Sequence, residues 1–238
     1  MNILSIDSSG PILSLTLKLD DKVSNFSDEQ KSRASQIILS SIDALLSKSK
    51  IEVNDLDAIV FNKGPASFTG TRVAASVCQA IGYTQDIPVI GISSLSLMAF
   101  VYYLKSKYSN ITCIRKAYSN KFYVGHFEID NSKYETIKSV YLCNADDLKF
   151  DKKNHYVSDS WEKIIPALDN DQLKDINYFG EEVPLNSEIL LEYAEKYSNF
   201  KEPFNLIGIG PPFSDPTPTV YTFTPSFAIF CATCFVSS

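Results

Sequence analysis

The sequence predicts an α/β protein of two lobes, of which the second is reduced. Three observations support this class. The chain begins with three short apolar segments separated by turns, which is the pattern of an antiparallel meander. Strand-like and helical segments then alternate up to about residue 104, and a second group of strand-like segments begins at residue 110. A length of 238 residues allows one or two domains with a sizeable core.

The three strands of the meander are expected at residues 2–6, 11–19 and 22–26. The middle segment places leucines on one face and mostly polar residues on the other, as a half-buried strand does. Asp20 and Asp21 provide the turn before the third strand. The first strand ends at Asp7, which is followed by small hydroxyl residues.

The rest of the first lobe alternates helices with strands. Residues 32–49 are expected to form an amphipathic helix. Two further apolar residues, Ile37 and Leu39, widen its apolar surface, which indicates either a partner surface or a helix buried within its own domain. A strand over 56–61, a helix over 71–83, a strand over 87–92 and a helix from Ser94 through Val101 follow. The resulting order, βββαβαβα, is that of one half of the two-lobed actin-like (ribonuclease-H-like) architecture, also called the ASKHA fold.

The second lobe is predicted to be smaller. Strands are expected at residues 110–115, 121–129, 136–142 and 155–158, a helical turn at 144–148, and helices at 161–168 and 186–197. We therefore expect a first lobe over 1–104, a smaller lobe over 105–207, and an atypical tail over 208–238 that is rich in Pro, Thr and Phe.

The tail has no expected functional role. It holds five of the eleven prolines and no charge after Asp215. Cys231 and Cys234 form a lone Cys-x-x-Cys pair without a second pair or nearby histidines, so a zinc site is not expected. The apolar end is too short to span a bilayer.

The loop between the 56–61 strand and the following helix holds the densest group of special residues. It suggests two interpretations, a phosphate-binding cradle at a helix N-terminus or a tight structural connection. Five residues separate Gly64 from Gly70, and Thr71-Arg72 stands where a P-loop has Lys and Ser or Thr, so the spacing favours the structural connection. The residues assigned to this structural loop are Gly64, Pro65, Ser67, Phe68, Thr69, Gly70 and Arg72.

Composition and charge narrow the function classes. The formal charge is −6 with an isoelectric point near 5.0, which argues against nucleic-acid binding through the whole surface. The N-terminal residues lack the positive region of a signal peptide, and no stretch is apolar enough to span a membrane. Five cysteines, an odd number, fit reduced thiols. A cytoplasmic protein without a membrane partner is therefore expected.

The loop, the first strand and the Gly91-Ile92-Ser93-Ser94-Leu95 helix start resemble the TsaB family, whose loop reads Gly-Pro-Gly-Ser-Phe-Thr-Gly-x-Arg. The resemblance is good over residues 1–105 and loose over 106–207. Ala66 replaces a glycine of the family loop, and Lys116-Ala117-Tyr118 stands where the family often has Asp-Ala-Arg.

This resemblance implies a function through a partner. TsaB-like proteins are catalytically silent relatives of TsaD and bind it through the first two helices of the N-terminal lobe. The pair works with the ATPase TsaE, and the product is threonylcarbamoyl-adenosine 37 in tRNAs that read ANN codons, so tRNA is involved indirectly. Without TsaD, the same surface could form a homodimer. Carried onto this chain, the interface comprises Ile38, Ile42, Leu45, Val73, Ala74 and Val77. Ala74→Glu or Ile42→Asp is then expected to abolish the heterodimer and leave the monomer folded.

The groups needed for catalysis are not apparent in the sequence. An active actin-like phosphotransferase has further glycine-rich loops in its second lobe, where this chain offers only the isolated Gly125 and Gly180. TsaD binds metal through a His-x-x-x-His pair, and the matching helix here has no histidine near Lys31 to Ser35. We therefore expect no catalytic residue, no cofactor and no metal, with Asp7 and Ser8 as a vestigial nucleotide site. The alternatives are a degenerate ATP-binding phosphotransferase and a metallopeptidase-like enzyme of the same fold.

Overall fold

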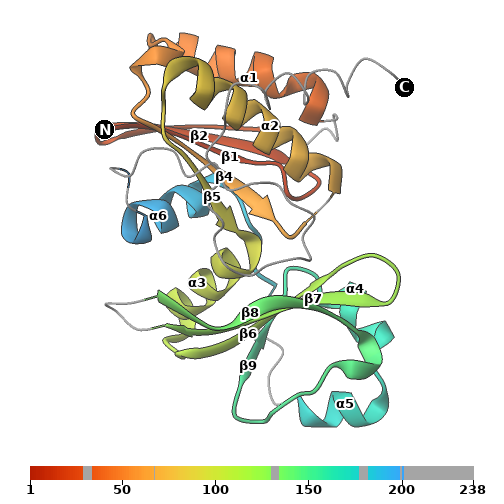
Figure 1. Ribbon diagram of the computed structural model, residues 1–238. Helices are drawn as coiled ribbons and strands as arrows, with labels where there is room; N and C mark the ends of the chain where they lie inside the picture. The colour runs from red at the N-terminus through yellow and green to blue at the C-terminus, as the bar shows by residue number, and fades with distance from the viewer. Residues whose placement is uncertain (29–33, 67, 130–133, 177–181, 199, 201–238) are drawn as a thin grey trace.

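The computed structural model describes residues 1–28, 34–66, 68–129, 134–176, 182–198 and 200 (Figure 1). The predicted tail over 208–238, with its Cys-x-x-Cys pair, lies outside the described residues, and so does Ser67. The described part contains two sheets, one above the other in Figure 1, each with helices on both faces.

The first sheet has five strands in the order β3-β2-β1-β4-β5. Its strands are β1 (Asn2–Asp7), β2 (Leu13–Leu19), β3 (Lys22–Asp28), β4 (Ala58–Gly64) and β5 (Val89–Ser93). The first three form the predicted antiparallel meander, whereas β4 and β5 run parallel to β1. The carboxyl ends of β1, β4 and β5 therefore lie along one edge of the sheet.

Helices α1 (Ala34–Ser49) and α2 (Phe68–Gln85) cover one face of this sheet, where they lie side by side (Figure 1). A short 3-10 turn, Val53–Asp55, links α1 to β4. The core beneath the helices combines leucines of β2 with the inner sides of α1 and α2. Small residues on α2, Ala74, Ala75 and Cys78, are fully or almost fully buried there, so this helix approaches the sheet closely.

The second sheet has the order β8-β7-β6-β9. Its strands are β6 (Asn110–Lys116), β7 (Lys121–Ile129), β8 (Tyr134–Asn144) and β9 (His155–Val157), with a 3-10 turn at Ala145–Asp147. Helices α4 (Trp161–Ile164) and α5 (Asn170–Asp175) contribute to the core on one face, together with Tyr156 and Phe122. The strands agree with the predicted ones to within two residues at each end.

Two helices of this lobe differ from the prediction. The helix expected over 161–168 is divided into α4 and a 3-10 turn, Ile165–Ala167, because Pro166 lacks an N–H and disturbs the preceding turn. The sequence reading missed α5. The side chain of Asp169 accepts hydrogen bonds from the first-turn amides of α5, and Gln172 completes a capping box, so the Asp-x-x-Gln spacing was an available signal.

Helix α3 (Ser94–Ser106) lies between the two sheets (Figure 1). Leu97 contributes to the core of the first sheet, whereas Leu95, Met98 and Tyr102 pack on the second. Apolar residues all round the helix are typical of complete burial inside a protein. Among the described helices, none combines the length and the apolar character needed to cross a membrane.

Helix α6 (Ser187–Tyr197) follows the second sheet in sequence but packs on the first sheet, opposite α1 and α2. Leu190, Leu191 and Ala194 meet Ile3 and Val60 there. Hydrogen bonds also join α6 to the meander, between the hydroxyls of Ser187 and Thr16 (2.7 Å), from Ser5 to the Ser187 carbonyl (2.8 Å), and from Asn25 to Glu188 (2.6 Å). The sequence places this helix in the smaller lobe expected over 105–207. In the structure it packs on the first sheet and covers the face opposite α1 and α2.

This packing predicts a large effect of truncating Leu190. The side chain is fully buried, so Leu190→Ala is expected to lower the free energy of unfolding by about 2–5 kcal/mol. Urea denaturation followed by circular dichroism measures the change. Glu192→Ala, at an exposed position of the same helix, is expected to stay within about 0.5 kcal/mol of the wild type. Equal effects of the two variants would contradict the assignment of α6 to the core.

Candidate functional site

A buried polar cluster lies at the edge where β1 and β4 end. The carboxylate of Asp7, which is 3% exposed, accepts a hydrogen bond from the Ser9 amide (2.8 Å). Asn62 donates to the Ser9 hydroxyl (3.0 Å) and accepts bonds from the Ser94 hydroxyl (2.7 Å) and the Gly64 amide (3.0 Å). Asn62 therefore connects the β1–β2 turn, the end of β4 and the start of α3, and satisfies buried groups of all three.

Ser8, in the turn between β1 and β2, lies directly against α2. The Ser8 hydroxyl donates to the carbonyl of Gly70 at 2.8 Å. A Cβ atom on Gly70 would lie only 2.0 Å from the Ser8 carbonyl oxygen, so no other residue fits without a backbone shift. The contact gives Gly70 a packing role, because it lets the β1–β2 turn touch the first turn of the helix.

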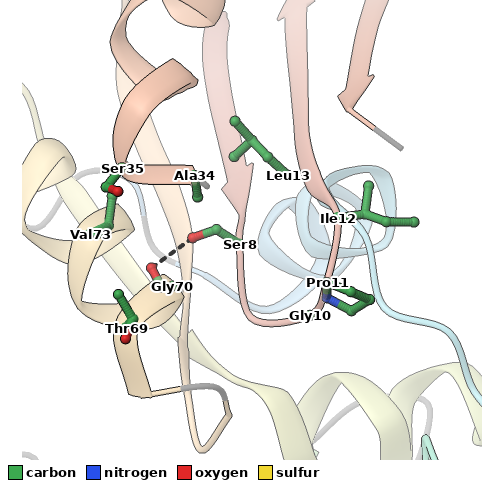
Figure 2. A pocket seen from close by; sticks show the side chains of 10 residues that line it. All are labelled: Ser8, Gly10, Pro11, Ile12, Leu13, Ala34, Ser35, Thr69, Gly70 and Val73. Atoms are coloured by element: carbon green, nitrogen blue, oxygen red, sulfur yellow. Dashed lines mark hydrogen bonds between the residues drawn. The ribbon is translucent and has the colours of Figure 1, made fainter. Parts of the chain in front are cut away.

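A cavity of about 380 Å³ opens beside this contact (Figure 2). It lies between the β1–β2 turn and the N-terminal ends of α1 and α2, and its lining residues are Ser8, Gly10, Pro11, Ile12, Leu13, Ala34, Ser35, Thr69, Gly70 and Val73. None of these lining residues is charged. Among the described residues that line the cavity there is therefore no cationic side chain of the kind that usually accompanies a nucleotide phosphate.

The loop that enters α2 is bound at its middle by the second sheet. Gly64 has φ of +87°, a left-handed conformation that favours glycine. The carbonyl of Pro65 accepts a hydrogen bond from Nη1 of Arg115 (2.9 Å), and Nε of the same arginine pairs with Asp159 (2.8 Å). The sequence reading assigned no role to Arg115 or Asp159. Arg72, the arginine that it assigned to the loop, lies on the exposed side of α2.

The two histidines lie in separate environments. His126 Nδ1 is 2.9 Å from the Thr112 hydroxyl, and His155 Nδ1 is 3.0 Å from the Tyr102 hydroxyl. Burial lowers the pKa of His155, which favours its neutral form. The His155 ring also stacks on Tyr108 with 3.6 Å between the ring centroids. In the described ranges, no group of three or more His, Cys, Asp or Glu side chains is arranged to hold a metal ion.

The buried thiols are poorly suited to nucleophilic chemistry. Burial raises the pKa of Cys78 well above its usual value, and burial together with the nearby Asp159 carboxylate does the same for Cys113. Both thiols are fully buried, so neither combines the low pKa with the access that a reactive cysteine has.

Four of the six residues proposed from the sequence as a partner interface face the interior, and this corrects their assignment. Ile38, Ile42, Leu45 and Ala74 are at most 5% exposed and belong to the core under α1 and α2. The remaining two, Val73 and Val77, are half-buried against the same core. A stripe at helical spacing marks the buried side of a helix, and here the chain's own sheet covers that side. Ala74→Glu and Ile42→Asp would therefore place a charge in the core and unfold the protein.

On the opposite side of these helices, several of the described side chains are exposed. Leu39 on α1 is 62% exposed and Tyr83 on α2 is 56% exposed, with Ser76 and Ala80 also exposed on α2. We call these four residues the α1–α2 outer face. Only three charged residues, Asp43, Lys48 and Arg72, occur in the two helices, although 21% of the chain is charged. Helix α6, which is shorter, contains four.

Comparisons with known proteins decide the family. A family model described as "TsaD: tRNA N6-adenosine threonylcarbamoyltransferase" matches residues 23–195. A curated protein of Buchnera aphidicola (from Schizaphis graminum), "tRNA threonylcarbamoyladenosine biosynthesis protein TsaB", is 30% identical over 168 residues, which cover 68% of this chain and 80% of that protein. The chain belongs to the TsaB family. The TsaB proteins of Haemophilus influenzae (31% identical) and Escherichia coli (26%) match over about half of this chain and of their own lengths.

Solved structures support the TsaB fold. A crystal structure from Pseudomonas aeruginosa, described as an uncharacterized protein with similarity to peptidase YEAZ, superposes with a TM-score of 0.68 and covers 82% of this chain and 90% of its own. A second structure, "YeaZ from Pseudomonas aeruginosa", gives 0.64. At 20% and 18% identity, these likenesses concern the fold alone. The predicted two-lobed actin-like fold and the predicted TsaB resemblance are both confirmed.

Proposed function

We propose that this TsaB-family chain is a non-catalytic subunit that binds TsaD through the α1–α2 outer face. In this role it supports the threonylcarbamoylation of adenosine 37 in tRNAs that read ANN codons, with TsaE in a larger complex. The proposal extends the shared process, tRNA threonylcarbamoyladenosine biosynthesis, that the names of its relatives give.

The low number of charged residues in α1 and α2 is the main support for the binding role. The fully buried centres of protein interfaces are depleted in charged residues and enriched in aromatic ones. The outer face offers the exposed Leu39 on α1, and the exposed Tyr83 on α2 together with the small side chains of Ser76 and Ala80. Small residues allow a partner helix to approach closely, while Leu39 and Tyr83 provide apolar area to bury.

The polar cluster at the sheet edge supports the non-catalytic part of the proposal. Asp7 accepts a hydrogen bond from the backbone of its own turn, and Asn62 is hydrogen-bonded to Ser9, Gly64 and Ser94. These groups hold the first lobe together at the position where actin-like enzymes place their nucleotide. The hydrogen bonds that these groups form within the protein support a structural role.

Mixing the full chain with its cognate TsaD tests this function. Size-exclusion chromatography with light scattering is expected to give a 1:1 heterodimer, and the same measurement on the chain alone reports any homodimer. Two proteins that elute separately at micromolar concentrations would overturn the binding role. Metal analysis and ATP titration of the isolated chain test the alternatives, since stoichiometric zinc or iron, or ATP turnover, would identify an enzyme.

A further inference from the structure

Arg115 joins three segments that lie far apart in the sequence. It extends from β6 of the second sheet, and its Nε pairs with Oδ2 of Asp159, which follows β9 (2.8 Å). Its Nη1 donates to the carbonyl of Pro65 in the loop between β4 and α2 of the first lobe (2.9 Å). Arg115 is 8% exposed, so it is shielded from any partner at the surface.

The chemistry of this contact depends on the guanidinium group. Its planar fork presents several N–H donors in fixed directions, which lets one side chain satisfy a carboxylate and a carbonyl together. The ammonium group of lysine is a compact charge on a flexible stem and lacks this fixed geometry. Asp159 neutralises the buried arginine and fixes its orientation, because a buried charge requires a partner.

The loop that receives this bond is held at three places. Asn62 binds the amide of Gly64 at its start, and Ser8 binds the carbonyl of Gly70 in the first turn of α2. Arg115 binds Pro65 between these two points. Asn62 and Ser8 belong to the first lobe, whereas Arg115 belongs to the second sheet. Through Arg115, the second sheet therefore also helps to position the loop.

We infer that Arg115, oriented by Asp159, is a positioning residue for partner binding. It holds the β4–α2 loop, and therefore the N-terminal part of α2, in the arrangement that the α1–α2 outer face needs for TsaD. This inference rests on the proposed function for the identity of the partner. It gives the second lobe a role in binding although the outer face lies wholly on the first.

Binding kinetics with Arg115→Lys test the inference. If the variant populates the competent arrangement for a smaller fraction of the time, the apparent affinity falls by that fraction. We expect the association rate constant for cognate TsaD to fall about tenfold, with the dissociation rate constant within about twofold of the wild type. Loss of a direct contact would instead raise the dissociation rate constant. Surface plasmon resonance with the full chain measures both constants.

Controls separate positioning from charge and from stability. Arg115→Lys keeps the charge beside Asp159, and Asp159→Asn provides a second variant, for which a smaller loss of association rate is expected. Lys121→Met removes a positive charge from the β6–β7 hairpin, where the Lys121 ammonium lies over the Tyr118 ring, and its rate constants are expected to match those of the wild type. Equal slowing by Lys121→Met would assign the effect of Asp159→Asn to its change of charge. An association rate constant of the charge-preserving Arg115→Lys that equals the wild-type value would overturn the inference.

Hydrogen exchange in the free protein gives a readout that does not involve TsaD. Peptides that cover residues 60–72 are expected to exchange several-fold faster in Arg115→Lys, with the rest of the first sheet unchanged. Unchanged exchange in these peptides, or an equal increase throughout the protein, would overturn the inference. If the loop exchanges faster in Arg115→Lys but the wild-type chain does not bind TsaD, only the proposed function is contradicted.

Discussion

Leu39→Glu is expected to weaken TsaD binding about 100-fold or more, which corresponds to about 2.8 kcal/mol. Leu39 is the most exposed large apolar residue of α1, at 62%. A carboxylate at this position would lose its water in the complex and gain no opposite charge. The burial of an unpaired charge costs free energy. In the free protein the new side chain remains in water, and Glu is a good helix former, so the fold is preserved.

Isothermal titration calorimetry with cognate TsaD measures this loss, and circular dichroism confirms that the variant is folded. Val140→Glu is a matched control, because Val140 is also exposed but lies on β8 of the second sheet. Its affinity is expected to equal that of the wild type. Ala80→Glu provides a second position on the outer face and is expected to weaken binding similarly. Wild-type affinity of both Leu39→Glu and Ala80→Glu would show that TsaD binds elsewhere.

Gly70→Ala is expected to destabilise the protein by about 3 kcal/mol. The added methyl group would lie 2.0 Å from the Ser8 carbonyl oxygen, a backbone atom that cannot rotate away. Either α2 or the β1–β2 turn must shift, and inserting atoms into a tightly packed contact typically costs about 1–3 kcal/mol or more. The same shift stretches the hydrogen bond from Ser8 to Gly70, which adds to the loss.

Urea denaturation measures this change, and the same turn offers a matched control. A Cβ atom on Gly10 meets nothing within 4 Å, so Gly10→Ala is expected to be neutral or to stabilise by up to about 1 kcal/mol. Similar stability of the two variants would mean that the turn does not depend on its contact with α2.

Local patterns predicted most of the elements of this fold. The order βββαβαβα follows from alternation and helical periodicity, and the described structure confirms it. The position of α6 could not be predicted in this way. Its apolar stripe, which includes Leu190 and Ala194, identifies a buried side but does not say which sheet buries it. The resemblance to TsaB places Ile38 and Ile42 on a partner-binding helix, and the periodicity of that helix does not say whether a partner or the chain's own sheet covers them.

The site was only partly predictable for a different reason. Asp7 and Gly70 stand in recognisable local contexts, at a strand end and in a turn. Asn62 and Arg115 act through residues 32 to 53 positions away in the sequence. The local sequence around a single polar residue in a predicted strand does not indicate which distant residue it will bind. The described structure was therefore needed to identify the residues that connect the two lobes.

The return of α6 to the first sheet has a consequence for how the chain is made. When only residues 1–104 have left the ribosome, Ile3 and Val60 have no helix α6 to cover them. Until residue 197 emerges, this side of the sheet is covered only in part, by α3 with Leu97. The lobe that is proposed to bind TsaD can therefore complete its core only after nearly the whole described chain has been synthesised. We expect a shorter nascent chain to expose apolar surface that chaperones bind.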